Sequence, residues 1–255
     1  MKAIILAGGM GSRLRDVVTD IPKPMAPVGG KPFLEYIIAM LAGRRFRHII
    51  LSVGYRKEII ESYFENGSRW GVDISYSRED APLGTGGSVR EALRTADEPY
   101  SLILNGDTFN DLDFGEMEVH HLSRKRLVTI GLIHRDDAGR YGSIRLNHTS
   151  DIAGFSEKSG SGPGYVNRGV YIMDRAVLDR MPSGRFSLEE DLFPELVAAG
   201  MTGFISRGFF IDMGIPAAYR YIDEHSYLLE QTKPGGAVQG AGKAGEVEAY
   251  DEVRS

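Results

Sequence analysis

The chain has 255 residues, of which 42% are hydrophobic and 25% are charged, so it is long enough to bury one large core. Its 35 acidic and 30 basic residues give a net charge of −5, which excludes broad nucleic-acid binding but leaves room for a local anion site. It has no cysteine, which excludes a disulfide framework and a thiol catalyst. No apolar run reaches the length that spans a bilayer, and Met1 leads directly into a predicted strand, so we expect a cytoplasmic protein.

The first half of the chain alternates short apolar runs with stretches in which apolar residues recur at helical spacing. Strands are predicted over residues 2–6, 48–53, 72–77 and 101–104, and helices over residues 32–42, 57–66 and 87–96. This alternation predicts a parallel sheet with helices on both faces. Such sheets bind their ligands beyond the carboxyl ends of the strands.

The second half is richer in predicted strands, which span residues 128–134, 142–146, 152–156, 165–173 and 203–210. A capping box, Ser187-Leu188-Glu189-Glu190, predicts the start of one helix, and Pro216 suits the first turn of another. His120 and His121 fall in a predicted helix without metal-ligand spacing, so we expect them on a solvated face. Residues 231–255 are rich in Gly, Ala and acidic side chains, which predicts a disordered tail.

A glycine-rich loop follows the first predicted strand and carries Arg13. Backbone N–H groups can approach a phosphate closely where side chains are missing, and Arg13 together with Lys23 supplies positive charge. The dinucleotide pattern G-x-G-x-x-G is excluded because Leu14 replaces its third glycine, and no P-loop ending is present. The glycines alone would also suit a plain strand-to-helix turn, but with both cations they indicate a triphosphate site.

The same segment resembles the signature of the sugar-1-phosphate nucleotidyltransferases, which reads here Leu6-Ala7-Gly8-Gly9-Met10-Gly11-Ser12-Arg13-Leu14 and then Pro22-Lys23-Pro24-Met25. Members of this family join a nucleoside triphosphate to a sugar 1-phosphate and release pyrophosphate. The resemblance implies an α/β fold with a Rossmann-like, mostly parallel mixed sheet flanked by helices. It implies a single domain over residues 1–230, with a nucleotide-binding half over about 1–110 and a sugar-phosphate-binding half over about 111–230.

Two aspartates follow predicted strands, and the resemblance implies that they hold a magnesium ion. Asp107 ends Leu104-Asn105-Gly106-Asp107, and Asp212 stands before the helix predicted near Pro216. Read without the family, Asp107 is equally a turn residue and Asp212 a helix cap. Nucleotidyl transfer needs a hard cation to neutralise phosphate charge, and carboxylate oxygens are suitable ligands for it.

Two further segments resemble binding loops of the family. Leu83-Gly84-Thr85-Gly86-Gly87 resembles the loop that lies against the base and ribose, and Glu79 upstream offers an acceptor to a purine edge. Phe155-Ser156-Glu157-Lys158 resembles the segment that holds the sugar hydroxyls and the sugar phosphate, although Ser159 replaces the usual proline. Without the family, these segments read as a flexible loop and an exposed ion pair.

The resemblance therefore implies three groups of site residues beside the metal pair. The catalytic residues are Arg13 and Lys23. The nucleotide-binding residues are Leu6, Ala7, Gly8, Gly9, Gly11, Ser12, Arg13, Glu79, Gly84, Thr85, Gly86, Asn105 and Gly106. The sugar-phosphate-binding residues are Gly142, Glu157, Lys158 and Asn167, of which Asn167 offers both a donor and an acceptor to hydroxyls.

Within the family, the 83–87 loop and the segment 210–216 are most similar to the D-glycero-D-manno-heptose 1-phosphate guanylyltransferases, which implies GTP and a heptose 1-phosphate as substrates. Mannose-1-phosphate guanylyltransferases and uridylyltransferases for N-acetylmuramate or glucose 1-phosphate are the alternatives. A different class, a non-catalytic module that binds nucleotide sugars, is disfavoured by the presence of Arg13, Lys23, Asp107 and Asp212. Neither a nucleic acid nor a membrane is an expected partner, and the sequence does not give the oligomeric state.

Overall fold

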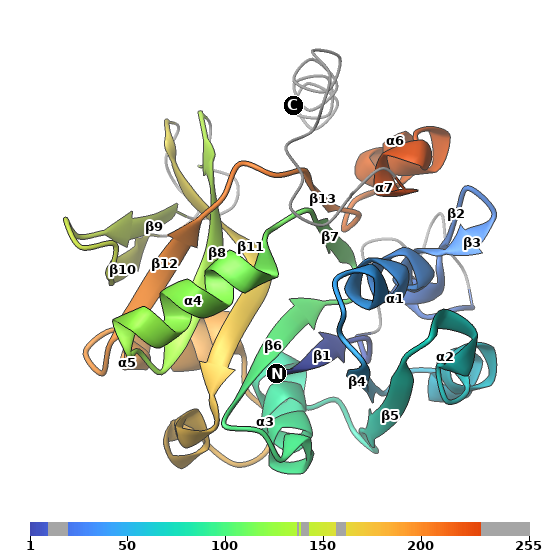
Figure 1. Cartoon of the computed structure of the whole chain (residues 1–255), viewed down its shortest axis with the longest axis horizontal. Coiled ribbons are helices and arrows are strands. Elements are labelled where there is room, and N and C mark those ends of the chain that lie inside the picture. Colours follow the sequence, from blue (N-terminus) through green and yellow to red (C-terminus); the bar gives the residue numbers. More distant parts are fainter. Residues whose placement is uncertain (10–19, 137, 139–142, 157–161, 231–255) are drawn as a thin grey trace.

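The computed structural model describes residues 1–9, 20–136, 138, 143–156 and 162–230. Its centre is a nine-stranded mixed sheet with helices on both faces (Figure 1). Four parallel strands come from the first half of the chain, in the order β6, β1, β4, β5. They are β1 (Lys2–Leu6), β4 (His48–Val53), β5 (Asp73–Arg78) and β6 (Tyr100–Asn105).

The remaining five strands of the sheet come from the second half, and β11 (Gly164–Asp174) joins them to the first four by pairing antiparallel with β6. β8 (Val128–Arg135) pairs antiparallel with β11, and β12 (Met201–Ile205) lies parallel to β8. β9 (Ser143–Leu146) and β10 (Ile152–Ser156) extend the sheet beyond β11. The sheet therefore runs through both predicted halves.

Two short ribbons lie outside this sheet. β2 (Pro27–Val28) pairs with β3 (Lys31–Pro32), after a 3-10 turn over Lys23–Met25. β7 (Thr108–Asn110) pairs antiparallel with β13 (Phe210–Asp212) just beyond the end of β6 (Figure 1). The second ribbon brings together two segments that are about a hundred residues apart in the sequence.

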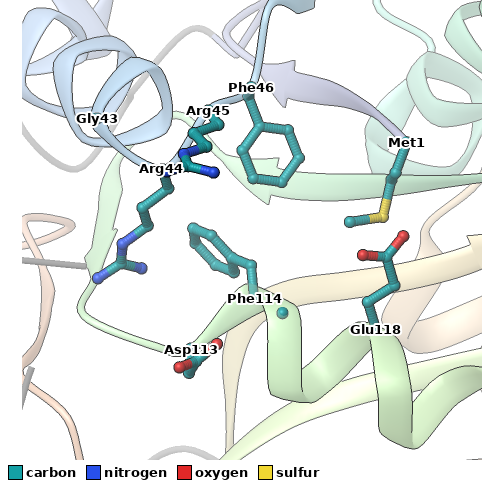
Figure 2. A pocket seen from close by; sticks show the side chains of 9 residues that line it. Met1, Gly43, Arg44, Arg45, Phe46, Asp113, Phe114 and Glu118 are labelled. Carbon is teal, nitrogen blue, oxygen red and sulfur yellow. The ribbon is translucent and has the colours of Figure 1, made fainter. Parts of the chain in front are cut away.

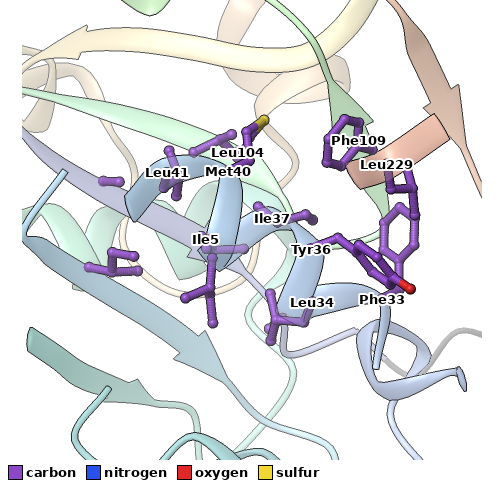
Figure 3. Packing of buried hydrophobic residues seen from close by; sticks show 14 of the residues in the cluster. Ile5, Phe33, Leu34, Tyr36, Ile37, Met40, Leu41, Leu104, Phe109 and Leu229 are labelled. Carbon is purple, nitrogen blue, oxygen red and sulfur yellow. The ribbon is translucent and has the colours of Figure 1, made fainter. Parts of the chain in front are cut away.

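Apolar residues on alternate sides of the strands bury the two faces of the sheet against different helices. One face packs on α1 (Phe33–Gly43), α2 (Lys57–Phe64), α4 (Phe114–Arg124), α6 (Pro216–Glu224) and α7 (Tyr227–Glu230), together with the 3-10 turn Ser68–Trp70. Figure 3 shows Leu34, Ile37 and Leu41 of α1 above Ile5 of β1. Because Ala3 and Ile5 point to this face, Ile4 points to the other.

The opposite face packs on α3 (Gly84–Ala96), the 3-10 helix Arg175–Arg180, a π-helix over Leu188–Leu192 and α5 (Phe193–Leu196). The predicted α/β class with a mixed sheet flanked by helices is confirmed. Within the described part of the chain, no helix is both long and apolar enough to cross a membrane.

The strand predicted over residues 203–210 is wrong, because the chain forms two strands there. β12 ends at Ile205, and the chain then leaves β8 so that β13 can pair with β7. Gly208 makes this crossing possible, since a Cβ atom at this position would lie 1.6 Å from the Asp111 carbonyl oxygen.

The capping residue predicted before residue 188 is confirmed, but the helix that follows is not regular. The Ser187 Oγ accepts a hydrogen bond from the Glu190 N–H at 3.2 Å, as a capping box requires. In the reciprocal bond, the Ser187 N–H donates to the Asp191 carboxylate at 2.7 Å, instead of to that of Glu190. This shift by one residue accompanies the wider first turn of the π-helix.

Candidate active site

A cleft of about 810 Å³ opens where three parallel strands end. Its lining includes Leu6 at the end of β1, Gly54 after β4 and Asn105 at the end of β6. The facing wall comes from the segment 185–190, which lies about a hundred residues further along the chain. The cleft therefore lies at the carboxyl edge of the sheet, where the sequence predicts the ligand site.

Lys23 and Asp107 form an ion pair within this cleft. The Lys23 side chain is 8% exposed and Pro22 and Pro24 bracket it, so the ammonium group has little freedom to turn away. The Asp107 side chain keeps 30% of its surface exposed, and its second oxygen accepts a hydrogen bond from Thr108 at 3.2 Å. A buried ammonium group can neutralise a phosphate, whereas the carboxylate beside it can approach a phosphate only with a cation between them.

The β7–β13 ribbon brings Asp212 next to this pair. Asp212 lies opposite Thr108 in the ribbon, and the Met213 N–H donates a hydrogen bond to the Asp107 carbonyl at 3.1 Å. The Asp212 Oδ1 accepts from the Gly214 N–H at 2.7 Å, whereas α6 begins without a side-chain cap. The alternative that Asp212 caps this helix is thereby excluded, and the two aspartates predicted as metal ligands lie on adjacent backbone segments.

Glu79 is fixed by internal hydrogen bonds at the floor of the cleft. Its Oε1 accepts from the hydroxyl groups of Ser52, at 3.1 Å, and Ser88, at 2.6 Å. Among the described residues, its Oε2 accepts a single longer bond of 3.3 Å, from the Leu83 N–H. A Cβ atom on Gly8 would approach Oε1 to 3.0 Å, so the first glycine of the loop allows the backbone to lie directly against this carboxylate.

A chain of hydrogen bonds joins the nucleotide loop to the predicted sugar side. The Glu189 carboxylate accepts from Thr85 Oγ1 and from the Tyr171 hydroxyl, both at 2.9 Å. The Asn167 amide in turn donates to the Tyr171 oxygen at 2.9 Å. Burial, followed by the charge of Glu189, raises the pKa of Tyr171 well above its usual range, so its hydroxyl remains a neutral donor.

The cleft is acidic over its described part. Five carboxylates and two basic side chains line it, namely Glu79, Asp80, Asp107, Glu189, Glu190, Lys23 and Arg185. A triphosphate would meet net negative charge on these walls, so its binding requires additional positive charge.

The comparison with protein families decides what this cleft belongs to. The family model described as "Nucleotidyl transferase" matches residues 2–228 of the chain. The chain belongs to the nucleotidyltransferase family. It is 44% identical over 223 residues to D-glycero-alpha-D-manno-heptose 1-phosphate guanylyltransferase from Aneurinibacillus thermoaerophilus, an alignment that covers 86% of this chain and 96% of the relative.

Two further similarities are to a guanylyltransferase and to a protein solved with a guanine nucleotide. The chain is 32% identical over 243 residues to mannose-1-phosphate guanylyltransferase from Mycobacterium tuberculosis, with 93% of this chain and 67% of the relative covered. Its fold is similar to the crystal structure of HddC from Yersinia pseudotuberculosis complexed with GMP-PN, with a TM-score of 0.79 and 33% identity over 88% of this chain and 99% of that one.

Two glycines of the nucleotidyltransferase signature loops have packing roles in the structure. A Cβ atom on Gly86 would lie 2.1 Å from the Phe186 ring, and the Gly86 N–H donates to the Phe186 carbonyl at 2.9 Å. A Cβ atom on Gly106 would lie 2.6 Å from the Leu6 carbonyl oxygen, to which the Gly106 N–H donates. These N–H groups hold the cleft walls together, and Gly86 and Gly106 are absent from its lining, unlike Gly84 and Thr85.

Several predicted site residues lie outside the described part of the chain. They are Gly11, Ser12, Arg13, Gly142, Glu157 and Lys158. Of the described ones, Leu6, Gly8, Gly9, Glu79, Gly84, Thr85 and Asn105 line the cleft, together with Lys23 and Asp107. Ala7 is fully buried behind the loop, and its N–H donates to the Ser52 carbonyl at 2.8 Å.

A second pocket, of about 580 Å³, lies at the opposite end of the parallel strands. Figure 2 shows Phe46 and Phe114 together on one side of it, their ring centroids 5.9 Å apart edge to face, and Met1 and Glu118 on the other side. Its Glu118 accepts from the Tyr100 hydroxyl at 2.9 Å, and its Arg44 pairs with Asp111 at 2.5 Å. These polar groups have partners within the protein, and none of the predicted site residues that the structure describes lines this pocket.

Sequence reasoning missed Glu189, Arg185 and Ser88 as cleft residues. Glu189 was interpreted only as part of a capping box, and nothing in its local pattern indicates that it faces Thr85 across 104 positions of sequence. Ser88 follows the glycines of the 83–87 loop, and its place in the first turn of α3 is the one signal that points toward the cleft.

Proposed function

We propose that this chain is a guanylyltransferase that joins GTP to D-glycero-D-manno-heptose 1-phosphate, giving a GDP-sugar and pyrophosphate. The carrying observation is the Lys23–Asp107 pair, which lies beside Asp212 at the carboxyl edge of the sheet, in a chain closely related to enzymes of this activity. Mannose 1-phosphate is the alternative acceptor, because mannose-1-phosphate guanylyltransferases are similar over most of the chain.

The reaction is a direct substitution at phosphorus. An oxygen of the sugar 1-phosphate attacks the α-phosphorus of GTP, a new P–O bond forms, and the bond to the β-phosphate bridging oxygen breaks as pyrophosphate leaves. No protein nucleophile is required, since the attacking phosphate is itself an anion. The protein therefore contributes positioning and charge neutralisation. Lys23, which pairs with Asp107 in the cleft, is proposed to neutralise charge on the reacting phosphates, and Arg13 is proposed to stabilise the leaving pyrophosphate.

A magnesium ion fits the residues at this edge. Asp107 and Asp212 present carboxylate oxygens on adjoining backbone segments, and Mg²⁺ is usually held by one or two carboxylates with the phosphates of the substrate. The substrate phosphates would supply the remaining ligands of such a site. When bound, the ion would neutralise charge on the phosphates. We propose these two aspartates as its protein ligands.

Glu79 is proposed to select guanine. A carboxylate acceptor can bind the N1–H and the exocyclic amino group on the guanine edge, whereas uracil offers one N–H between two carbonyl groups. Ser52 and Ser88 donate hydrogen bonds to Oε1, so the carboxylate cannot turn away from the cleft floor. Among the described residues, Oε2 accepts a single long bond, from the Leu83 N–H. The pocket side of the carboxylate thus presents an acceptor at a fixed position.

The test crosses GTP, ATP, UTP and CTP with heptose, mannose, glucose and N-acetylmuramate 1-phosphates, and measures pyrophosphate release for each pair. We expect GTP with the heptose phosphate to give the highest kcat/KM. In Glu79→Gln, the preference for GTP should fall by the equivalent of about 1–3 kcal/mol, because one acceptor is lost.

A preference for UTP or CTP would exclude guanylyl transfer while leaving nucleotidyl transfer intact. If GTP is the preferred triphosphate but mannose 1-phosphate gives the highest kcat/KM, the acceptor is mannose 1-phosphate instead of the heptose phosphate. If no pair turns over and calorimetry still detects binding of a nucleotide sugar, the chain is a binding module instead of an enzyme.

A further inference from the structure

Arg168 is a fully buried arginine with no exposed surface, and it directly follows Asn167, a predicted sugar-phosphate-binding residue. The pairing of β11 with β8 shifts register between Asn167 and Tyr171, and Gly169 has a φ of +68° there. Such a bulge re-aims side chains relative to a regular strand. The side chain of Arg168 consequently reaches out of the sheet toward the β7–β13 ribbon.

The guanidinium group binds both strands of that ribbon at one end. Its Nε donates to the Asn110 Oδ1 at 2.9 Å, and the Asn110 amide donates back to the Arg168 carbonyl at 3.1 Å. Its terminal nitrogens donate to the carbonyl groups of Ser206, Gly208 and Phe209, at 3.2, 3.0 and 2.8 Å. Asn110 is the last residue of β7, and Phe209 immediately precedes β13.

The ribbon needs such a clamp because it is short. Its register contains three residue pairs, from Phe210 opposite Asn110 to Asp212 opposite Thr108. An isolated two-stranded ribbon is at best marginally stable in water. Arg168 fixes the end at Asn110, and the predicted metal ligands Asp107 and Asp212 lie at the other end.

A second arginine supports the same turn from outside. Arg44 pairs with Asp111, one residue after β7, at 2.5 Å and also donates to the Leu112 carbonyl. The Asp111 N–H in turn donates to the Phe209 carbonyl at 2.8 Å. The Phe209 oxygen therefore accepts from both Arg168 and the Asp111 N–H, so Asp111 links the two arginines.

The charge of Arg168 is costly to bury. Desolvation lowers its pKa from 12.5 to about 9. Within the described part of the chain, its guanidinium donates to carbonyl oxygens of the backbone and of the Asn110 amide instead of to carboxylates. An apolar residue of similar volume would fill the space without this penalty. A role in packing alone therefore does not account for an arginine here, whereas fixing several backbone carbonyls in one geometry does, because the guanidinium fork has rigidly placed donors.

We infer that Arg168 is a positioning residue that sets the spacing of Asp107 and Asp212 by clamping the far end of the β7–β13 ribbon. This inference rests on the proposed role of those aspartates as the cation site. It predicts that loss of the fork weakens cation binding, although the arginine touches neither the cation nor the substrates.

The test compares Arg168→Met, which keeps the length of the side chain without its donors, with Arg175→Met as a matched control. Arg175 also donates to carbonyl groups, those of Leu93 and Arg94 at 3.1 and 3.3 Å, but at the distant end of α3. For each protein we would measure Mn²⁺ binding by electron paramagnetic resonance, the Mg²⁺ concentration for half-maximal activity, and the melting temperature.

We expect Arg168→Met to raise the Mn²⁺ dissociation constant and the half-maximal Mg²⁺ concentration by about tenfold, the scale of losses on changing groups that orient metal ligands. Its KM for GTP at saturating cation should change much less. Arg175→Met should leave both cation constants unchanged, whatever it does to the melting temperature. If Arg168→Met lowers only the melting temperature, the residue is merely structural and the inference is overturned.

Two further variants keep the inference testable. Where Arg168→Met does not fold, Arg168→Lys retains the charge but not the fork, and it should show the same rise in both cation constants; unchanged constants overturn the inference. Asp212→Asn separates this inference from the proposed cation site. If Asp212→Asn leaves Mn²⁺ binding intact, the cation site itself is wrong, whereas weakened binding in Asp212→Asn with normal binding in Arg168→Met rejects only the positioning role.

Discussion

Asp107 and Asp212 stand next to each other but have different partners. Asp107 is paired with the Lys23 ammonium, whereas Asp212 accepts a backbone bond from Gly214. Asp107 lines the cleft, and Asp212 lies opposite the neighbouring Thr108 in the β7–β13 ribbon. The position of a cation held by both residues would therefore depend on the two side chains and also on the β7–β13 ribbon, which sets the distance between them.

Asp107→Asn and Asp212→Asn should each lower kcat by about 10²-fold or more, because each removes a charge that places the proposed cation against the reacting phosphate. Steady-state rates at saturating GTP, measured with Mg²⁺ and after treatment with EDTA, check this expectation. Asp73→Asn is the control, since Asp73 is exposed and starts β5 at the opposite edge of the sheet. Full activity in EDTA, or in either variant, contradicts the assignment.

Gly86→Ala should destabilise the protein and widen the cleft. The added methyl group would lie 2.1 Å from the buried Phe186 ring, so Phe186 and the neighbouring wall of the cleft must move. Overpacking of this kind typically costs about 1–3 kcal/mol. Thermal melting and the KM for GTP check this expectation. The matched variant is Gly43→Ala, where a Cβ atom meets nothing within 4 Å, and equal behaviour of the two variants would contradict the packing role.

At the scale of elements, α4 carries a buried histidine that corrects a sequence prediction. His121 was expected on a solvated face, yet it is 2% exposed, and its Nδ1 lies 2.8 Å from the Thr129 hydroxyl of β8. The wrong prediction has a simple origin. A polar side chain such as histidine is expected to face water, but α4 packs this one against β8, where the Thr129 hydroxyl supplies a hydrogen-bond partner.

The stability of α4 on the sheet should therefore depend on pH. Burial lowers the pKa of His121 from 6.5, an effect larger than the opposing attraction of Asp174. In the unfolded chain the group takes up its proton near the ordinary value, whereas in the folded protein it does so only at lower pH. Stability from neutral His121 is thus present above about pH 6.5 and is lost as the pH falls below this value.

His121→Asn keeps a polar atom near the Nδ1 position but does not titrate. Its melting temperature should fall less steeply than that of the parent protein between about pH 7 and about pH 5. Differential scanning calorimetry across this range measures the slope, and the value above pH 7 gives the loss of packing separately. Parallel curves for the two proteins would mean that His121 is not the source of the acid sensitivity.

At the scale of the whole molecule, the antiparallel pairing of β11 with β6 builds the acidic cleft from both halves of the chain. The junction brings the second half of the chain against the first, so that Glu189 reaches Thr85 across the cleft. This arrangement also gathers the carboxylates that line the cleft around the site of a highly charged substrate. Substrate binding should therefore stabilise the fold only when a divalent cation offsets this charge.

With GTP at about a hundred times its dissociation constant, the free energy of unfolding should rise by about 2.7 kcal/mol. For a chain of this size, that corresponds to an increase of about 5–10 °C in melting temperature. Thermal melts with GTP alone, Mg²⁺ alone and both together measure the effect. We expect the full increase only with both, and an equal increase with GTP alone would contradict the electrostatic argument.

The sequence by itself determined the α/β class, the strands that carry the site and the family. β1 and β4 begin and end where the apolar runs predict, because a buried parallel strand needs a continuous apolar run that polar and glycine residues terminate. The signature around Lys23 indicated phosphate chemistry, since a glycine loop with fixed cations is a local property of the chain. The sequence likewise placed Asp107 just after a predicted strand, where a ligand-binding carboxylate is expected.

Only the tertiary structure decided which distant residues meet. The crossing at Gly208, the pairing of Asp212 with the segment after Asp107, and the bond from Glu189 to Thr85 join positions that no local periodicity relates. Arg168 illustrates the physical reason. In the sequence it is an ordinary charged residue within a strand, and its burial follows from the carbonyl groups that two separate segments bring to it. Long-range contacts of this kind depend on chain topology, which local patterns do not encode.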